Sequence, residues 1–161
     1  KKNILPSVIC EPSLGVERAF LVFMFDSYSF DKERENIVLR LHPKIAPIKA
    51  AVFPIVKTNE KIVKISEEVY ADLKKDFDVI YDEGGSVGRR YARSDEIGTP
   101  FCITIDRESP KNKDVTIRDR DTMKQIRVKI LNLKETLKKL IGKEIQFEKA
   151  GKIFYNKIKE N

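Results

Sequence analysis

The chain has 161 residues, of which 41% are hydrophobic and 35% are charged. This length allows one complete domain and part of another, and the hydrophobic fraction is sufficient for a buried core. No stretch approaches the roughly 20 consecutive apolar residues that a membrane span requires, which excludes a transmembrane protein. The N-terminus lacks the apolar region and the cleavage site of a signal peptide. The chain begins with Lys1 instead of Met, which indicates a piece of a longer protein.

The net charge of +7 is concentrated at one end of the chain. Residues 1–123 contain 21 basic and 21 acidic residues, whereas residues 124–161 contain 11 basic and 4 acidic residues. A basic segment favours a polyanionic partner, because binding releases counterions from that partner. The alternative for the last dozen residues is a solvated, lysine-rich tail.

The chain has few residues suited to metal binding or nucleophilic catalysis. It contains two cysteines, Cys10 and Cys102, and one histidine, His42. A structural zinc site needs four ligands in paired short spacings, so we expect no metal site. Two cysteines do not make a disulfide framework, which favours a reduced, cytoplasmic setting. No acidic residue lies near His42 in the sequence to orient it, which argues against a catalytic role.

The N-terminal segments are predicted to be a short strand, a turn and a helix, at residues 5–10, 11–15 and 16–25. The helix is apolar on every side after Arg18, a pattern typical of a helix buried in a large body of protein. The rest of the chain does not look built to surround it, which indicates a missing domain. Residues 31–47 are charged and then rich in proline, so we expect a linker there.

From residue 48 the pattern changes to alternating strands and helices. Strands are predicted at residues 50–56, 78–82, 100–106, 114–120 and 125–130, and helices at residues 59–77, 86–97 and 132–141. Ser86 is expected to cap the second of these helices, and Gly98 and Gly142 to end the second and third. The alternation predicts an α/β domain over residues 48–145, with a mixed, mostly parallel five-stranded sheet flanked by helices. Residues 146–161 are expected to form a basic tail.

The first candidate site is the run Cys10-Glu11-Pro12-Ser13-Leu14-Gly15-Val16-Glu17-Arg18. An acidic side chain at a strand end can bind an amine, and glycine allows close approach of the backbone. Arg18 lies in the first turn of the predicted helix, where it can hold a phosphate beside the positive end of the helix dipole. A strand–glycine–helix junction with one arginine is more often only architecture.

The second candidate site is the run from Gly85 to Gly98. Arg89 and Arg93 are four residues apart and share one face of the predicted helix. Guanidinium groups near an aromatic ring, here Tyr91, suit phosphate contact and base stacking. The alternative is an internally neutralised surface, because two acidic residues follow directly.

The third candidate site is the run from Thr116 to Asp121. In a strand, Arg118 and Arg120 would lie on one face, with Asp119 and Asp121 on the other. Two carboxylates can act as general acid and base, but no nucleophile or metal ligand accompanies them here. A salt-bridged sheet edge is the better interpretation.

Two segments, in the correct order, carry a resemblance to one family. The run Cys10–Arg18 resembles motif 3 of the class II aminoacyl-tRNA synthetases, in the version found in glycyl-tRNA synthetases. The run Gly88–Phe101, with Arg118–Met123 downstream, is similar to the C-terminal anticodon-binding domain of the same enzymes. The resemblance covers residues 8–145, and relatives specific for threonine, proline or histidine differ in the second run.

The resemblance implies roles for the residues of the first run. Glu11 and Ser13 correspond to positions that bind glycine, with the carboxylate taking its α-ammonium group, and Gly15 corresponds to the floor of the site. Arg18 corresponds to the catalytic arginine that contacts the terminal phosphate of ATP. The expected ATP-binding residues are Gly15, Val16, Glu17 and Arg18. The apolar helix would then be the one buried behind the catalytic sheet.

The resemblance also implies that residues 48–145 bind the anticodon of a tRNA. In an open α/β sheet, binding surfaces form at strand ends and in the adjacent loops. The expected contact residues are Arg89, Arg90, Arg93, Asp95, Glu96, Arg118 and Arg120. Arginine and aspartate can read base edges, whereas the lysines of residues 124–161 would add salt-sensitive attraction.

Motifs 1 and 2 of the family are not found in this chain. We therefore expect residues 1–30 to be the end of a catalytic domain, and the whole chain to be the C-terminal piece of a glycyl-tRNA synthetase. The full-length enzyme would be a cytoplasmic homodimer that joins glycine to its tRNA through glycyl-adenylate, using ATP. Its Mg²⁺ ligands would lie outside this piece, which would be inactive by itself. The alternative is a non-catalytic synthetase-like paralogue or accessory subunit that binds nucleic acid, although such a protein has no need of motif 3.

Overall fold

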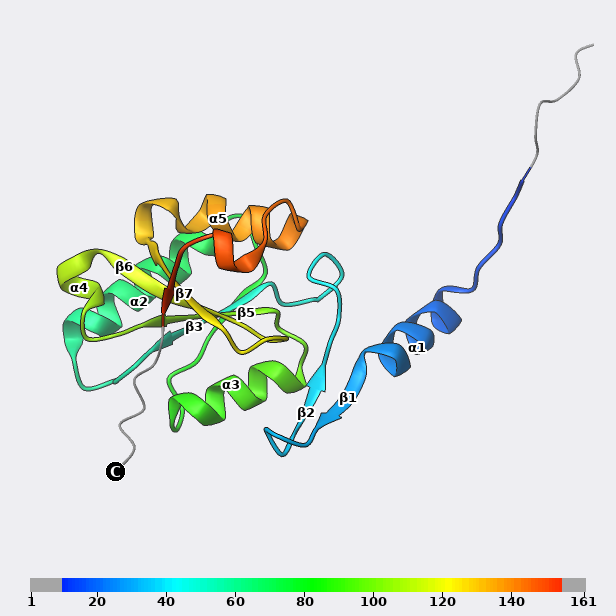
Figure 1. The fold of residues 1–161 in the computed structure, drawn as a ribbon, viewed down its shortest axis with the longest axis horizontal. Coiled ribbons are helices and arrows are strands. Elements are labelled where there is room, and N and C mark those ends of the chain that lie inside the picture. Colours follow the sequence, from blue (N-terminus) through cyan, green and yellow to red (C-terminus); the bar gives the residue numbers. More distant parts are fainter. Residues whose placement is uncertain (1–9, 155–161) are drawn as a thin grey trace, which may run out of the picture.

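The computed structural model describes residues 10–154, and its centre is a six-stranded sheet (Figure 1). The strand order is β4-β3-β5-β6-β7-β8. The strands are β3 (Ala50–Pro54), β4 (Val79–Tyr81), β5 (Phe101–Ile105), β6 (Asp114–Asp119), β7 (Gln125–Lys129) and β8 (Lys152–Phe154). Every residue of β3 and β5 is buried, because helices cover both faces of the sheet there.

The helices of this body are α2 (Glu60–Leu73), α3 (Val87–Glu96), α4 (Ser109–Asn112) and α5 (Ile130–Gly142). Helices α2 and α5 lie on one face of the sheet, and α3 lies on the opposite face (Figure 1). The larger core joins α2 and α5 to the sheet through residues such as Val52, Leu73, Ile103, Ile117 and Leu137. A smaller cluster of Ala51, Phe53 and Cys102 packs under α3. The prediction of a mixed α/β sheet flanked by helices is therefore confirmed, with one strand more than expected.

The directions of the strands differ from the expected mostly parallel arrangement. Strand β3 is parallel to both β4 and β5, whereas the pairs β5–β6, β6–β7 and β7–β8 are all antiparallel. The prediction of a mostly parallel sheet was wrong, because the connections from β5 to β6 and from β6 to β7 are too short for the crossover that a parallel pair needs. The connections through α2 and α3 are long enough and join parallel strands. The connection through α5 is also long enough, but β8 returns antiparallel to β7.

The helix ends follow local sequence signals in most cases. The side chain of Asn59 accepts the backbone N–H groups of Lys61 and Ile62 at the start of α2, and Ser86 accepts that of Arg89 at the start of α3. Gly142 was expected to be the stop residue after the third helix, but it is the last helical residue of α5, and the left-handed residue that follows is Lys143, at φ 55°.

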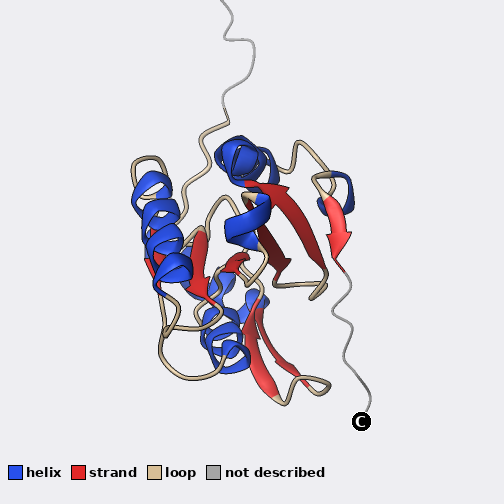
Figure 2. Cartoon of the chain, turned by 90° about the vertical axis from the view of Figure 1, so that its left-hand side faces the viewer, coloured by secondary structure: helices blue, strands red, loops and turns tan. Residues whose placement is uncertain are grey.

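The predicted linker and tail contain regular structure. Strands β1 (Tyr28–Asp31) and β2 (Asn36–Leu39) form an antiparallel hairpin that is separate from the main sheet and packs beside α3 (Figure 2). In the predicted tail, the turn η1 (Phe147–Lys149) precedes β8, and the ring of Phe147 stacks on that of Phe101. Both segments are rich in charged residues, which led to the prediction of irregular structure, but the apolar side chains between the charged ones pack against the rest of the chain.

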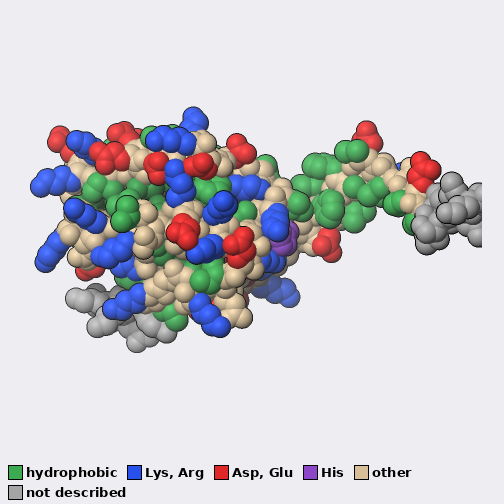
Figure 3. Space-filling view, turned by 90° about the horizontal axis from the view of Figure 1, so that it is seen from above, with side chains coloured by type: hydrophobic (Ala, Val, Ile, Leu, Met, Phe, Trp, Pro, Cys, Tyr) green, Lys and Arg blue, Asp and Glu red, His purple; other side chains and the backbone are tan. Residues whose placement is uncertain are grey.

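Helix α1 (Val16–Ser27) projects from the body as an arm (Figure 1). Its large side chains are exposed, including Val16, Phe20, Val22 and Phe25, which retain 61–80% of their accessible surface. Figure 3 shows them as a continuous apolar surface on the arm. The helix is present as predicted, but it is not buried among the described residues. Of the strand predicted before it, only Cys10 lies within the described residues, and the segment 10–15 has no regular structure.

Candidate nucleic-acid interface

Helix α3 begins and ends through defined backbone geometry. Ser86 caps its first turn, with 3.4 Å between the hydroxyl oxygen and the backbone nitrogen of Arg89. After the helix, Gly98 has φ +79°, and a Cβ there would lie 3.1 Å from the carbonyl oxygen of Leu39. Gly98 therefore serves both as the predicted stop signal and as a point of close approach to the β1–β2 hairpin.

Arg118 and Asp95 form a buried ion pair between β6 and α3. Arg118 Nη1 and Nη2 donate to the two carboxylate oxygens of Asp95 at 2.8 and 3.0 Å. The guanidinium carbon also lies 4.7 Å from the centre of the Tyr91 ring. Burial disfavours the charged form of Arg118, but the hydrogen bonds and charge of Asp95 outweigh it and raise the pKa of the arginine. The pair holds α3 on the sheet, and β6 lies inside the sheet rather than at the edge that the third run was expected to form.

Arg90 faces inward from α3 and is 3% exposed. Its Nη1 donates to the carbonyl oxygen of Pro54 at 2.6 Å, and its Nη2 donates to that of Gly85 at 3.0 Å. These bonds tie the end of β3 to the turn that precedes α3. The guanidinium group is therefore engaged with the backbone of its own chain.

Arg120 is the largest of the fully buried side chains and is 1% exposed. It donates to the carbonyl oxygens of Gly98 and Leu41, each at 2.8 Å. Its Nε and Nη2 also donate to the carboxylate of Asp121. Arg120 thus joins the end of α3 to the segment that follows the hairpin.

Three of the expected contact residues remain on the surface of α3. Arg93 is exposed and pairs with Asp82, its Nη2 lying 2.5 Å from Asp82 Oδ2. Burial raises the pKa of Asp82, but the hydrogen bonds from Arg93 and the backbone of Gly84 hold it below its ordinary value. The side chains of Arg89 and Glu96 are exposed and form no hydrogen bond or ion pair with the described residues.

The segment that resembles motif 3, residues 10–18, lies on the arm, away from α3. Residues 10–18, including Glu11, Ser13 and Arg18, are all exposed. Gly15 is the N-cap of α1, and Arg18 lies in its first turn, as expected. The backbone N–H groups of this turn and the guanidinium of Arg18 together make a surface that suits an anion. The described residues provide no opposite wall for it.

The described residues offer little for metal or thiol chemistry. Within residues 10–154 no group of three or more His, Cys, Asp and Glu side chains is placed to hold a metal ion. Burial raises the pKa of Cys102 to about 12, so its thiol stays protonated and unreactive. No helix in the same part of the chain is both long and apolar enough to cross a membrane.

The sequence reasoning missed polar residues of the hairpin and of the strand ends. Arg34 and Arg40 come from the predicted linker, and both pair with Asp31 of the same segment. Arg34 reaches Asp95 and the backbone of Arg120, and Arg40 reaches Asp121. At the carboxyl ends of β3 and β5, a shallow hollow is lined by Val56, Thr58, Asn59, Glu60, Lys61 and Arg107. The change of direction between the connections through α2 and α3 marks this edge as a binding position. The sequence contained that signal in the order of its elements.

Comparison with known families identifies the body of the chain. Residues 49–140, more than half of the chain, match the family described as "Anticodon binding domain". The chain belongs to this family. The resemblance of its second run is therefore confirmed, and residues 49–140 are an anticodon-binding domain.

Relatives that match most of the chain are glycine–tRNA ligases. The chain is 56% identical to that of Caldanaerobacter subterraneus over 122 residues, which are 74% of this chain and 26% of the relative. It is 52% identical to that of Bacillus cereus over 134 residues, 81% of this chain and 28% of the relative. The chain thus spans about a quarter of the length of these relatives. Because only 21 residues follow residue 140, both matches must include residues before 49.

Solved structures support the same fold. A prolyl-tRNA synthetase from Cryptosporidium parvum, complexed with halofuginone and AMPPNP, matches with a TM-score of 0.61 and 26% identity. The match covers 65% of this chain and 23% of the synthetase.

In the anticodon-binding domain of this chain, four expected contact residues are buried and bonded internally, namely Arg90, Asp95, Arg118 and Arg120. The exposed side chains of α3 and the strand ends are the polar groups that remain available to a ligand.

Proposed function

We propose that this chain is part of a glycyl-tRNA synthetase, in which it binds the tRNA anticodon and supplies motif 3. The observation that carries the proposal is the 52–56% identity to glycine–tRNA ligases, which extends beyond the anticodon-binding domain toward the arm. The longer enzyme would ligate glycine to its tRNA through glycyl-adenylate, and a non-catalytic paralogue is not favoured by these relatives. A homodimeric state and a cytoplasmic location belong to the same proposal.

We propose that the motif 3 segment binds the small substrates. Glu11 and Ser13 would hold glycine, with Gly15 at the floor of the site and Arg18 against the terminal phosphate of ATP. Gly15, Val16 and Glu17 would contact the ATP through their backbone at the start of α1. Support comes from the position of Arg18 in the first turn of α1, where its charge and the helix dipole both favour a phosphate. Mg²⁺ would neutralise the triphosphate, with ligands from other parts of the enzyme.

We propose two roles for the arginines around α3. Arg89, Arg93 and Glu96 would contact the anticodon loop, because they are exposed on one helix. Single-stranded loop bases need stacking, hydrogen bonds and neutralised phosphates together, and guanidinium groups provide all three. The buried group of Arg90, Asp95, Arg118 and Arg120 would instead hold the helix in place. Lysines of residues 124–161 would add salt-sensitive affinity.

The parent activity is tested by amino-acid-dependent pyrophosphate exchange on the longer enzyme. We expect exchange with glycine, and exchange with threonine or proline but not glycine would overturn the proposal. The chain of 161 residues by itself should give no exchange, because Arg18 cannot align two substrates without the rest of the site.

The anticodon surface is tested by Arg89→Ala, with Lys75→Ala, just after α2, as the matched control. Arg89→Ala should weaken binding of the cognate tRNA by about 1–3 kcal/mol through the loss of a base contact. Lys75→Ala, which removes an exposed ion pair to Asp72, should leave that binding unchanged. If Arg89→Ala and Arg93→Ala bind cognate and anticodon-swapped tRNA as the wild type does, α3 is structural and the interface lies elsewhere.

A further inference from the structure

The β1–β2 hairpin is joined to α1 without an intervening loop. Helix α1 ends at Ser27, and β1 begins at the next residue. The backbone N–H of Arg40 donates to the carbonyl oxygen of Ser27 at 2.7 Å, and Met24 packs against a small cluster that includes Leu39. A movement of the hairpin therefore moves the end of α1 with it.

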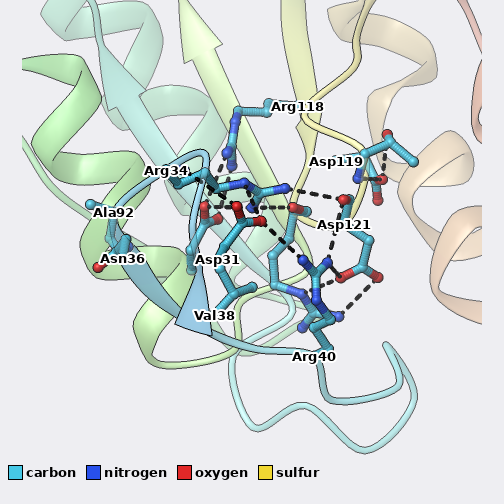
Figure 4. Close-up of polar contacts among 12 residues, drawn as sticks. Asp31, Arg34, Asn36, Val38, Arg40, Ala92, Arg118, Asp119 and Asp121 are labelled. Carbon is cyan, nitrogen blue, oxygen red and sulfur yellow. Dashed lines mark hydrogen bonds and ion pairs between the residues drawn. The ribbon is translucent and has the colours of Figure 1, made fainter. Parts of the chain in front are cut away.

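The other end of the hairpin is fixed to the anticodon-binding domain through its turn (Figure 4). The side chain of Arg34 is 9% exposed. Its Nη1 donates to Asp95 Oδ2 at 3.1 Å and to the carbonyl oxygen of Arg120 at 2.7 Å. Its Nη2 donates to the carbonyl oxygen of Asp121 at 3.1 Å. One side chain of the hairpin thus contacts α3 and the end of β6 together.

Two further contacts reinforce this attachment. Asn36 Nδ2 donates to the carbonyl oxygen of Ala92 on α3 at 3.1 Å. Arg40 bridges the hairpin and the domain, with Asp31 Oδ2 at 3.1 Å and Asp121 Oδ1 at 3.3 Å. Hydrogen bonds between charged groups are directional, so they set an orientation as well as an affinity.

Asp95 is the point at which the network meets the proposed anticodon surface. Its carboxylate binds Arg34 of the hairpin and Arg118 of the sheet, and its backbone belongs to α3 next to Glu96. A shift of α3 on tRNA binding would change the distance between Asp95 and Arg34. Segments joined by a small interface move relative to one another unless specific contacts hold them.

We propose that Arg34 is a positioning residue that couples the anticodon surface on α3 to the motif 3 helix α1. Through the hairpin, it sets the orientation of α1 according to the position of α3. A misplacement of about 1 Å can cost on the order of a hundredfold in rate. The inference rests on the proposed function, because it concerns the transfer of glycine to tRNA.

The test compares Arg34→Ala with the wild type in the longer enzyme. We expect glycine-dependent pyrophosphate exchange without tRNA and the Kd for cognate tRNA each to stay within twofold of wild type. The kcat for aminoacylation of cognate tRNA should fall about tenfold, with little change in KM. The loss of kcat that an anticodon-swapped tRNA causes in the wild type should shrink in the variant.

Conservative and matched variants separate coupling from loss of structure. Arg34→Lys should recover part of kcat, because it keeps the charge but not the paired donors. Lys75→Ala removes an exposed ion pair to Asp72 that is not part of this network, and it should leave kcat unchanged. If Arg34→Ala does not fold, Asn36→Ala removes the contact to Ala92 alone and should give a smaller fall in kcat with the same pattern.

Three outcomes would overturn the inference: wild-type kcat in both hairpin variants, unchanged anticodon discrimination, or an equal loss of pyrophosphate exchange. The last would mean that the hairpin supports the adenylation site directly. A wild-type enzyme without glycine-dependent exchange would instead contradict the proposed function, so the two failures are distinguishable.

Discussion

Helices α1 and α2 have similar lengths, 12 and 14 residues, yet they have opposite relations to the rest of the chain. Helix α2 carries one apolar stripe, with Ile62, Val69 and Leu73 buried against the sheet. Helix α1 is apolar on most sides, and its only buried residue is Ser27. One sheet can bury a single apolar stripe, whereas a helix with apolar side chains on every side is buried only when protein surrounds it.

The α/β body and the α1 arm therefore differ in where their apolar side chains are buried. The body and the hairpin bury their apolar side chains within residues 38–154, so they are stabilised by contacts inside this chain. The arm exposes an apolar surface of the kind that marks an interaction site. Substitutions in the body should therefore change the stability of this chain, and equivalent substitutions in the arm should not.

The largest difference is expected between two arginines. Arg118→Ala leaves the buried Asp95 with only Arg34 as a charged partner, and breaking a buried ion pair costs about 3–5 kcal/mol. Arg18→Ala, on the exposed first turn of α1, should leave the free energy of unfolding unchanged. Urea denaturation of the 161-residue chain, followed by circular dichroism, measures both. Equal losses would show that the arm and body unfold together.

The next difference concerns apolar side chains. Ile117 is fully buried in the centre of β6, and Ile117→Ala should cost roughly 3 kcal/mol through lost burial and a cavity. Phe25, which is 80% exposed, provides the contrast, and Phe25→Ala should change stability by less than about 0.5 kcal/mol. A large loss in Phe25→Ala would mean that α1 is covered in solution, as in a dimer of this chain. Repeating the denaturation at a tenfold lower protein concentration would detect that state.

Helix caps give a smaller contrast. Asn59→Ala removes the acceptor for two backbone N–H groups of α2 and should cost about 1 kcal/mol. The N-cap of α1 is Gly15, which has no side chain to lose, so Gly15→Ala should leave the urea midpoint of the body unchanged. Hydrogen exchange at the first turn of each helix would measure the two effects separately. A shift of the body's midpoint in Gly15→Ala would contradict the independence of the arm.

The smallest effect concerns acid stability. The pKa of Asp82 in the folded chain is held below its ordinary value. The ionised carboxylate therefore stabilises the fold fully above the ordinary pKa, and this stabilisation is lost as the pH falls from the ordinary pKa through the folded one. Asp82→Asn should therefore reduce the loss of stability on acidification. Arg93→Ala removes the partner side chain and should reduce the same loss. Parallel profiles for wild type and Asp82→Asn would contradict the assigned pairing with Arg93.

Much of the body was predictable, because its signals are local. Five strands, the caps at Asn59 and Ser86 and the stop at Gly98 follow from apolar periodicity and from residues with special backbone preferences. Strand β8 was missed because a strand of three residues that begins with a lysine is too short to carry a periodic signal. The hairpin was missed for a similar reason, since Asp31, Arg34 and Arg40 look like solvated charges until their partners are known.

The candidate site was predictable by residue type but not by role. The spacing of Arg89 and Arg93 placed both on α3, and both are exposed. The same run contains Arg90 and Asp95, which point inward, and sequence alone does not reveal which side of a helix so rich in charge meets the sheet. Burial separates the group that can touch a ligand from the group that holds the fold.

The sequence by itself determined the alternation of strands and helices, the ends of most elements and the resemblance to a synthetase, because these depend on neighbouring residues. The tertiary structure alone decided the strand directions, the burial of Arg118 and Arg120 and the attachment of the hairpin to α3. Those features depend on pairs such as Arg34 and Asp95, which are 61 residues apart. A charged side chain is buried only where a distant partner compensates for its lost hydration, and that partner is known only once the chain is folded.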